Sequence, residues 1–199
     1  MTGPLRIAVA DDEPEMLEYF ESTLTVLGHH VVVLARNGRE LVEGCRAQKP
    51  DLVVADIKMP VMDGLDAARQ IAQHGPIPVI LVSAHHDPDF ITRALDNQVL
   101  AYLVKPIKQA DLETAVALAM RRFHELQALC QQADSLRQAL NDRKVIERAK
   151  GVLMRRTGLD EQAAFTRLQK LASDHNWKLA QAAQNLLATE SVLMPPKAV

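Results

Sequence analysis

Four short apolar runs of the sequence each end in side chains that could take part in chemistry. The acidic pair Asp11-Asp12 and Asp56 are carboxylates, Ser83 is a hydroxyl and Lys105 is a cation. Carboxylates that lie close together repel each other unless a counter-ion separates them, and Mg²⁺ is a hard divalent cation suited to oxygen ligands. A metal-bound carboxylate can attack a phosphoryl group while Mg²⁺ neutralises charge on the transferred oxygens. These residue types therefore predict a phosphoryl-transfer pocket, in which Ser83 donates a hydroxyl and Lys105 supplies positive charge.

The segments that must bring these side chains together alternate between two kinds of residue pattern. Short β-branched or aliphatic runs read as buried strands, and the segments between them have a helical period. The predicted strands are Leu5–Ala10, Val31–Ala35, Leu52–Ala55, Val79–Val82 and Leu100–Val104, and the predicted helices are Pro14–Leu27, Gly38–Gln48, Gly64–Gln73 and Asp89–Asp96. Strands alternating with helices predict a doubly wound α/β fold around a five-stranded parallel sheet. The binding site of such a sheet lies at the carboxyl ends of its strands, where the acidic, hydroxyl and cationic residues stand.

The set of motifs around these residues resembles the receiver domain of bacterial response regulators. The matching pieces cover about residues 4–122 and comprise Val9–Glu13, Asp56–Gly64, Ser83-Ala84 and Ala101–Pro106. The resemblance implies a flavodoxin-like receiver domain over residues 1–122. It also implies that a sensor histidine kinase phosphorylates Asp56.

The same resemblance implies roles for further residues of the pocket. Mg²⁺ would be bound directly by Asp12, Asp56 and the backbone carbonyl of Lys58, and through water by Asp11. Ser83 and Lys105 would sense the phosphoryl group. Tyr102 would be the aromatic switch, although an ordinary surface tyrosine is the alternative. Lys58 and His85 stand where side chains modulate dephosphorylation, and Asn97–Leu100 departs from the small Gly-Ala stretch of many receivers.

A long helix is predicted to follow the receiver, because Asp111–Leu140 contains no Gly and no Pro. Apolar residues recur along it at alternating spacings of four and three, which is typical of a coiled-coil stripe. The stripe comprises Leu112, Val116, Ala119, Phe123, Leu126, Cys130, Ala133 and Leu140, with Arg137 interrupting it and Leu129 and Leu136 offering a competing register. Its first half is expected to lie on the receiver itself. Its second half could pair with the same helix of a second copy, to form a homodimer through residues 111–140.

Residues 141–190 have only helical patterns and are predicted to form a small three-helix all-α domain. The expected helices are Asn141–Arg156, Asp160 to about Asp174, and Trp177 to about Ala188, with Gly158 and Asp160 as stop and start signals. Lys144, Arg148 and Arg155 fall near one helical face, which suits a phosphate backbone. A solvated surface is the alternative reading. Residues 191–199, with Pro195-Pro196, are expected to be a disordered tail.

This second segment resembles the ANTAR domain, the output module of certain transcription antitermination regulators. The matching residues include Ile146, Ala149–Gly151, Leu153-Met154, Ala163–Phe165, Leu168, Leu179-Ala180, Ala183 and Leu187. The resemblance implies binding to RNA stem-loops in nascent transcripts, which prevents a terminator hairpin from forming. The candidate RNA contacts are Lys144, Arg148, Lys150, Arg155, Arg156 and Lys178. His175–Lys178 could also recognise unstacked loop bases, although core packing is the alternative role of Trp177.

Charge and composition fit two modules with different partners. Residues 1–140 hold 13 Lys and Arg against 19 Asp and Glu, whereas residues 141–199 hold 10 against 6. The two cysteines form no CxxC or zinc-ligand spacing, and no apolar stretch is long enough for a membrane span or a signal peptide. We therefore expect a cytoplasmic protein without a membrane partner. We expect no turnover enzyme, because the only chemistry indicated is phosphorylation and dephosphorylation of the protein itself.

These observations lead to one hypothesis of function and two alternatives. The hypothesis is a two-component response regulator that acts as a transcription antiterminator through RNA. The first alternative is a DNA-binding transcription regulator, against which stands the scarcity of base-reading side chains in the Ala-rich third helix. The second alternative is a phosphorylation-dependent adaptor whose C-terminal helices bind a partner protein.

Overall fold

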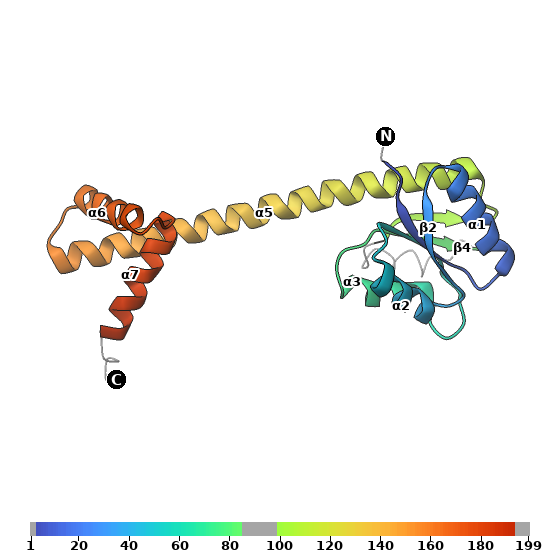
Figure 1. The fold of residues 1–199 in the computed structure, drawn as a ribbon, viewed down its shortest axis with the longest axis horizontal. Coiled ribbons are helices and arrows are strands. Elements are labelled where there is room, and N and C mark those ends of the chain that lie inside the picture. Colours follow the sequence, from blue (N-terminus) through green and yellow to red (C-terminus); the bar gives the residue numbers. More distant parts are fainter. Residues whose placement is uncertain (1–2, 85–98, 194–199) are drawn as a thin grey trace. The chain divides into compact units, whose positions relative to one another are not determined.

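The computed structural model describes residues 3–84 and 99–193 of the chain (Figure 1). The chain divides into two compact units, Met1–Gln127 and Ala128–Val199. Within the described ranges, no helix is both long enough and apolar enough to cross a membrane.

The first unit is built on a five-stranded parallel sheet, as the sequence predicts. Its strands are β1 (Arg6–Ala10), β2 (His30–Ala35), β3 (Leu52–Asp56), β4 (Val79–Ser83) and β5 (Val99–Val104). They are ordered β2-β1-β3-β4-β5, and every neighbouring pair is parallel. The chain passes from β1 to β2 on one side and then crosses to β3 on the other side of β1. The crevice at the carboxyl ends of β1 and β3 is therefore the topological switch point of the sheet.

Helices cover both faces of this sheet, so β3 and β4 are buried along their whole length. One face packs against α1 (Pro14–Val26) and the start of α5 (Gln109–Thr157), where Leu112, Val116 and Ala119 are buried as predicted. The other face packs against α2 (Gly38–Gln48) and α3 (Gly64–Ala72). The predicted helix Asp89–Asp96 lies outside the described residues.

Helix α5 continues from the first unit into the second without a break. It has 49 residues, so the segments predicted as separate helices, Asp111–Leu140 and Asn141–Arg156, are parts of one helix. The physical reason is that no Gly or Pro stands between Ile107 and Lys150 to interrupt it. Every residue from 128 to 140 is exposed, whereas residues at both ends of α5 are buried against their own unit.

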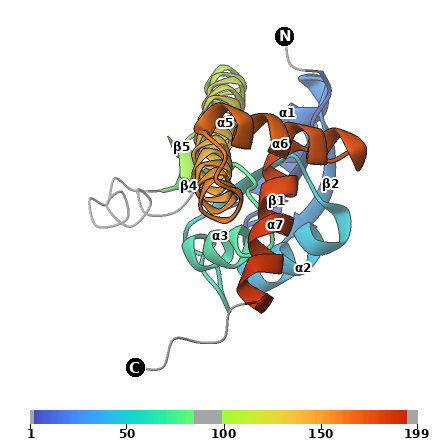
Figure 2. The same ribbon diagram turned by 90° about the vertical axis from the view of Figure 1, so that its left-hand side faces the viewer.

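The second unit packs α6 (Glu161–Asp174) and α7 (Leu179–Leu193) against the C-terminal part of α5. Figure 2 shows that α6 and α7 run in different directions. Asp160 caps α6 as predicted, because its side chain accepts a hydrogen bond from the backbone N–H of Ala163 at 2.7 Å. The core of this unit is small and Ala-rich, with Ala149, Leu168, Ala182 and Ala183 fully buried.

Helix α7 begins two residues later than predicted. Asn176 has a positive φ of 55°, which is incompatible with a helix, and the N–H of Trp177 donates to the carbonyl of Ala172. Asn176 and Trp177 therefore belong to a tight turn after the end of α6, and not to α7. Helix α7 also ends later than predicted, at Leu193, so residues 191–193 of the predicted disordered tail are helical. The rest of that tail, residues 194–199, lies outside the described residues.

One glycine controls the loop that follows β3. The backbone N–H of Gly64 donates to the carbonyl of Ile57 at 2.9 Å, which folds the loop back on itself at the start of α3. A Cβ atom at Gly64 would lie 2.2 Å from the carbonyl oxygen of Asp56. Because this neighbour is backbone of a buried strand, it cannot move away as a flexible side chain would.

We predict that Gly64→Ala lowers the free energy of unfolding of the first unit by about 1–3 kcal/mol, the usual cost of overpacking. Urea unfolding followed by circular dichroism measures this change. The matched control is Gly151→Ala, whose Cβ would meet only a side-chain atom of Arg155 at 3.5 Å. Removing glycine from the interior of α5 should leave stability unchanged or raise it by about 0.5–1 kcal/mol. Equal effects of the two substitutions would contradict the proposed clash.

Candidate functional site

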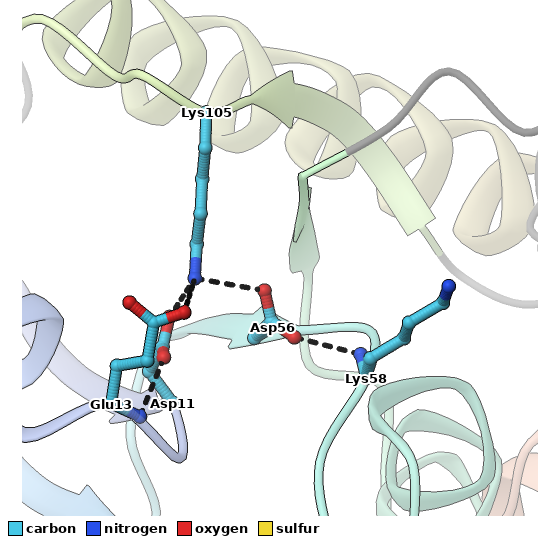
Figure 3. A network of polar contacts seen from close by, with 5 residues as sticks. All are labelled: Asp11, Glu13, Asp56, Lys58 and Lys105. Atoms are coloured by element: carbon cyan, nitrogen blue, oxygen red, sulfur yellow. Dashed lines mark hydrogen bonds and ion pairs between the residues drawn. The ribbon is translucent and has the colours of Figure 1, made fainter.

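The carboxyl end of the sheet gathers three carboxylates around one ammonium group (Figure 3). Lys105 Nζ lies 2.9 Å from Asp11 Oδ2, 3.2 Å from Asp56 Oδ1 and 3.7 Å from Glu13 Oε1. Asp11 follows β1, Asp56 ends β3, and Lys105 follows β5, so three strands supply the cluster. The structure thus brings together Asp11, Asp56 and Lys105 from the predicted set, while Asp12 is exposed and Glu13 takes the third place in the cluster.

The two buried carboxylates are each held by a second contact. Asp11 Oδ1 accepts a hydrogen bond from the backbone N–H of Glu13 at 3.0 Å, in a turn that starts α1. Asp56 Oδ2 accepts from the backbone N–H of Lys58 at 2.7 Å, in the loop after β3. Both carboxylates therefore have one oxygen fixed by backbone and the other turned toward Lys105.

Burial and charge act against each other in this cluster. Burial raises the pKa of the Asp56 carboxyl above its ordinary value, and the negative charge of Asp11 adds to this rise although Lys105 opposes it. Burial alone would lower the pKa of Lys105, but its hydrogen bond to Asp11 and the charges of both aspartates outweigh this and raise the pKa. Lys105 is therefore firmly cationic, and Asp56 would gain from a further positive charge nearby.

The remaining pocket residues are placed as follows. Ser83 is buried at the end of β4, and its carbonyl accepts a hydrogen bond from the backbone N–H of Lys105 at 2.9 Å. Tyr102 is half-buried on β5 and packs against the core on the α2–α3 side of the sheet. Asp12 and the side chain of Lys58 are exposed. His85 lies outside the described residues.

Glu13 is a member of the cluster to which the sequence interpretation gave no role. It is exposed and 3.7 Å from Lys105, so it stands at the mouth of the pocket. The run of three acidic residues Asp11-Asp12-Glu13 was the signal available, but a run does not tell which carboxylates turn inward.

The donor set suits a hard cation in its chemistry. Asp11 Oδ2 is fully buried and faces Lys105 Nζ at 2.9 Å, with no further partner among the described residues. Among the described residues, no group of three or more His, Cys, Asp or Glu side chains is already arranged to hold a metal ion. The oxygens nevertheless fit Mg²⁺, because an under-bonded buried carboxylate oxygen and a second carboxylate face one point.

The candidate RNA contacts separate into exposed and buried cations. Lys144, Arg148 and Arg155 are exposed on α5, and because α5 is continuous there, their spacing of four and seven keeps them near one face. Arg156 and Lys178 are also exposed.

Lys150 does not belong with these exposed cations. It is only 7% exposed, and its Nζ lies 2.7 Å from Glu161 Oε1 and 2.9 Å from Glu147 Oε1. The hydrogen bonds to Glu161 and Glu147 raise the pKa of Lys150, and the bond to Lys150 lowers the pKa of Glu161. The charge of Lys150 therefore joins α5 to the start of α6, and a contact of Lys150 with RNA stays a prediction.

Two families match the sequence. The response regulator receiver domain matches residues 7–117, and the ANTAR domain matches residues 134–187. The first match covers the strands and pocket described above, and the second covers the end of α5 together with α6 and most of α7.

Individual relatives agree with this division. The chain is 38% identical over 186 residues to the transcriptional regulatory protein PdtaR of Mycobacterium tuberculosis, covering 94% of this chain and 91% of that protein. The receiver domain of the response regulator NarL from Mycobacterium tuberculosis is 29% identical, with a TM-score of 0.57, over 60% of this chain and 98% of that one. A complex of CheX, CheY, BeF₃ and Mg²⁺ from Borrelia burgdorferi contains a chain 25% identical, with a TM-score of 0.55, over 57% of this chain and 87% of that one.

Family membership follows from these matches, since the receiver pattern alone spans more than half of the chain and the similarity to PdtaR spans nearly all of it. Proteins that join these two domains are regulatory proteins and not enzymes. The chain belongs to the response regulators that join a receiver domain to an ANTAR antitermination output domain, and it is a transcriptional regulator similar to PdtaR.

Proposed function

We propose that a sensor histidine kinase phosphorylates Asp56 in the cytoplasm, and that the phosphorylated protein binds RNA stem-loops in nascent transcripts and prevents termination. The observation that supports the first half is the cluster of Asp11, Asp56 and Lys105 at the switch point of the sheet. The ANTAR match and the exposed cations of α5 support the second half. We assign residues 1–122 to the receiver, 111–140 to the linking helix and 141–190 to the RNA-binding domain.

The chemistry is transfer of one phosphoryl group to Asp56. A carboxylate oxygen of Asp56 forms a bond to phosphorus as the bond from phosphorus to the kinase's imidazole nitrogen breaks, and the imidazole takes up a proton. The backbone N–H of Lys58, 2.7 Å from Asp56 Oδ2, orients the carboxylate. Lys105, 3.2 Å from Asp56 Oδ1, can stabilise charge on the transferred oxygens.

Mg²⁺ fits this pocket as the cofactor. Asp12, Asp56 and the backbone carbonyl of Lys58 would hold it, with Asp11 acting through water, and it would neutralise phosphoryl charge. Support comes from the under-bonded oxygen of Asp11 and from the Borrelia burgdorferi complex, which contains Mg²⁺ and BeF₃.

The response to phosphorylation is proposed to start at Ser83 and Tyr102. Ser83 is buried at the end of β4, directly beside β5, and its carbonyl accepts a hydrogen bond from the backbone N–H of Lys105. A hydroxyl that turns toward the phosphoryl group leaves space into which the half-buried Tyr102 can move. A charge change at Asp56 would in this way alter the outer surface of β5.

The exposed middle of α5 is the proposed dimer seam, which we define as Leu126, Leu129, Ala133, Leu136 and Leu140. Its four leucines are 50–68% exposed. The spacing of three and four residues is that of a coiled coil. In this register Leu129 and Leu136 take the seam positions that Cys130 and Arg137 hold in the other register. Arg137 forms a surface ion pair with Asp134, with 3.6 Å between Arg137 Nη1 and Asp134 Oδ1. We therefore propose the competing register for this seam, with a second copy of the chain as the partner.

We predict that Asp56→Asn abolishes phosphorylation by acetyl phosphate with Mg²⁺, because the amide cannot form the acyl phosphate. Phosphate-affinity gel electrophoresis measures the phosphorylated fraction. Asp66→Asn, a change of an exposed aspartate on α3, is the control and should be phosphorylated like the wild type. Phosphorylation of Asp56→Asn at the wild-type level, with an intact RNA response, would contradict the proposal.

We predict that Leu129→Glu with Leu136→Glu disrupts the homodimer, because two charges would have to be buried in the seam. Analytical ultracentrifugation of unphosphorylated and phosphorylated protein measures the mass. Gln131→Glu, on the opposite face of the same helix, should leave the mass unchanged. Rapid formation of a Cys130–Cys130 disulfide between copies, with no effect of the leucine changes, would instead support the register through Cys130.

We predict that Lys144→Gln with Arg148→Gln weakens binding to a stem-loop RNA and lowers its salt dependence, because fewer counter-ions are released. Each lost phosphate contact should reduce the slope of log affinity against log salt by roughly 0.7–0.9. Arg121→Gln, an exposed arginine in the part of α5 that belongs to the first unit, is the control. Stronger binding to duplex DNA than to any stem-loop would favour the DNA-binding alternative, and binding to neither would favour the protein adaptor.

A further inference from the structure

The second unit contains a pocket that neither the exposed cation stripe nor the core accounts for. It has a volume of about 540 Å³ and is lined by residues from α5, α6, the turn after α6 and α7. This volume lies within the range of about 300–1,000 Å³ that is usual for small-molecule sites. The pocket is made entirely of residues from the second unit, so its shape does not depend on the position of the receiver.

Two aromatic rings form one wall of the pocket. His175 and Trp177 stack with their ring centroids 4.4 Å apart and an interplanar angle of 18°. The left-handed backbone of Asn176 between them, with a φ of 55°, directs both side chains to the same side of the turn. Trp177 is half-buried against the core, so the ring pair is supported from behind.

The other walls combine an apolar floor with a polar rim. The floor is formed by Val152, Leu153, Leu171 and Leu186. Arg156 and Asn185 stand at the rim and are exposed, and they carry planar groups that donate hydrogen bonds in one plane. Among the described residues that line the pocket there is no carboxylate.

We propose that this pocket receives one unpaired nucleobase of the RNA loop. A flat π-face suits the ring pair, and a polar base edge suits the guanidinium of Arg156 and the amide of Asn185. The neighbouring exposed cations, including Arg155, match the phosphates on either side of such a base. The exposed Arg155 and Lys178, which are the sequence neighbours of the pocket residues Arg156 and Trp177, suit the phosphates of a nucleic acid and not an apolar peptide, so a protein ligand is the weaker fit.

This inference rests on the proposed RNA function and adds the residues that read the loop. The cation stripe contributes affinity that is independent of sequence, whereas the pocket would supply the contact to a base. The two surfaces can therefore be tested separately, because substitutions in one should not abolish the signal of the other.

The experiment uses the fluorescence of Trp177, which is the only tryptophan in the chain. The full-length protein, phosphorylated with acetyl phosphate and Mg²⁺, is titrated with a pool of stem-loop RNAs, with the same stems closed into blunt duplexes, and with free nucleoside monophosphates. We expect saturable quenching by looped RNA, little change with duplex, and weak quenching by free nucleotides. Quenching by free nucleotides as strong as that by RNA would overturn the assignment to an RNA loop.

Variants locate the contact. Trp177→Leu should weaken loop binding roughly 5- to 150-fold, measured by electrophoretic mobility, because stacking on one base is lost. Asn185→Ala, an exposed site that folding tolerates, should weaken binding and reduce quenching, whereas Gln181→Ala on the same helix should do neither. Lys144→Gln with Arg148→Gln should weaken binding but leave the quenching at saturation unchanged.

The outcomes separate this inference from the function on which it rests. If stem-loops bind while Trp177 emission stays constant and Asn185→Ala binds like the wild type, the pocket assignment falls and the RNA function stands. If no stem-loop binds in the mobility assay, both fall. A change of Trp177 emission produced only by a tryptophan-free amphipathic Leu/Lys peptide would assign the pocket to a protein partner and overturn the proposal.

Discussion

The ammonium group of Lys105 is the contact on which the architecture of the receiver pocket depends. Two buried aspartates at the ends of β1 and β3 would repel each other in a low-dielectric crevice without it. The same lysine follows β5, so the charge balance of the pocket is tied to the position of the outermost strand. Any change in the charge of Asp56 must therefore alter the forces on β5 and on the loop that leads into α5.

How far the sequence predicted this arrangement depends on the kind of interaction. Asp11, Asp56 and Lys105 could be placed because parallel strands put their carboxyl ends at one edge, so strand ends alone bring them together. The approach of Glu13 could not be predicted, since it depends on the direction of one exposed side chain. The ion pairs of Lys150 could not be predicted for a related reason. Its sequence neighbours resemble a basic helix face, but its burial results from the position of Glu161 on α6, which periodicity does not reveal.

The two units use charge in opposite ways. In the receiver the carboxylates outnumber the cation that holds them, so the pocket is ready for further positive charge. In the ANTAR unit Lys150 is neutralised by Glu147 and Glu161 inside the structure, while Lys144, Arg148 and Arg155 remain at the surface.

Helix boundaries in this region were harder to predict than site residues, because the turn at Asn176 and the continuity of α5 involve single residues that propensity describes poorly.

The unbroken course of α5 sets a rule for how the length of this family's linking segment can vary. Each residue inserted into the exposed stretch from 128 to 140 turns everything that follows by about 100° around the helix axis, because the helix has about 3.6 residues per turn. Insertions or deletions of seven residues nearly restore the position of the dimer seam around the helix axis, whereas those of one or two residues rotate one part of the seam away from the other. Linker length in natural or engineered fusions of a receiver to an ANTAR domain should therefore be constrained to steps of whole heptads.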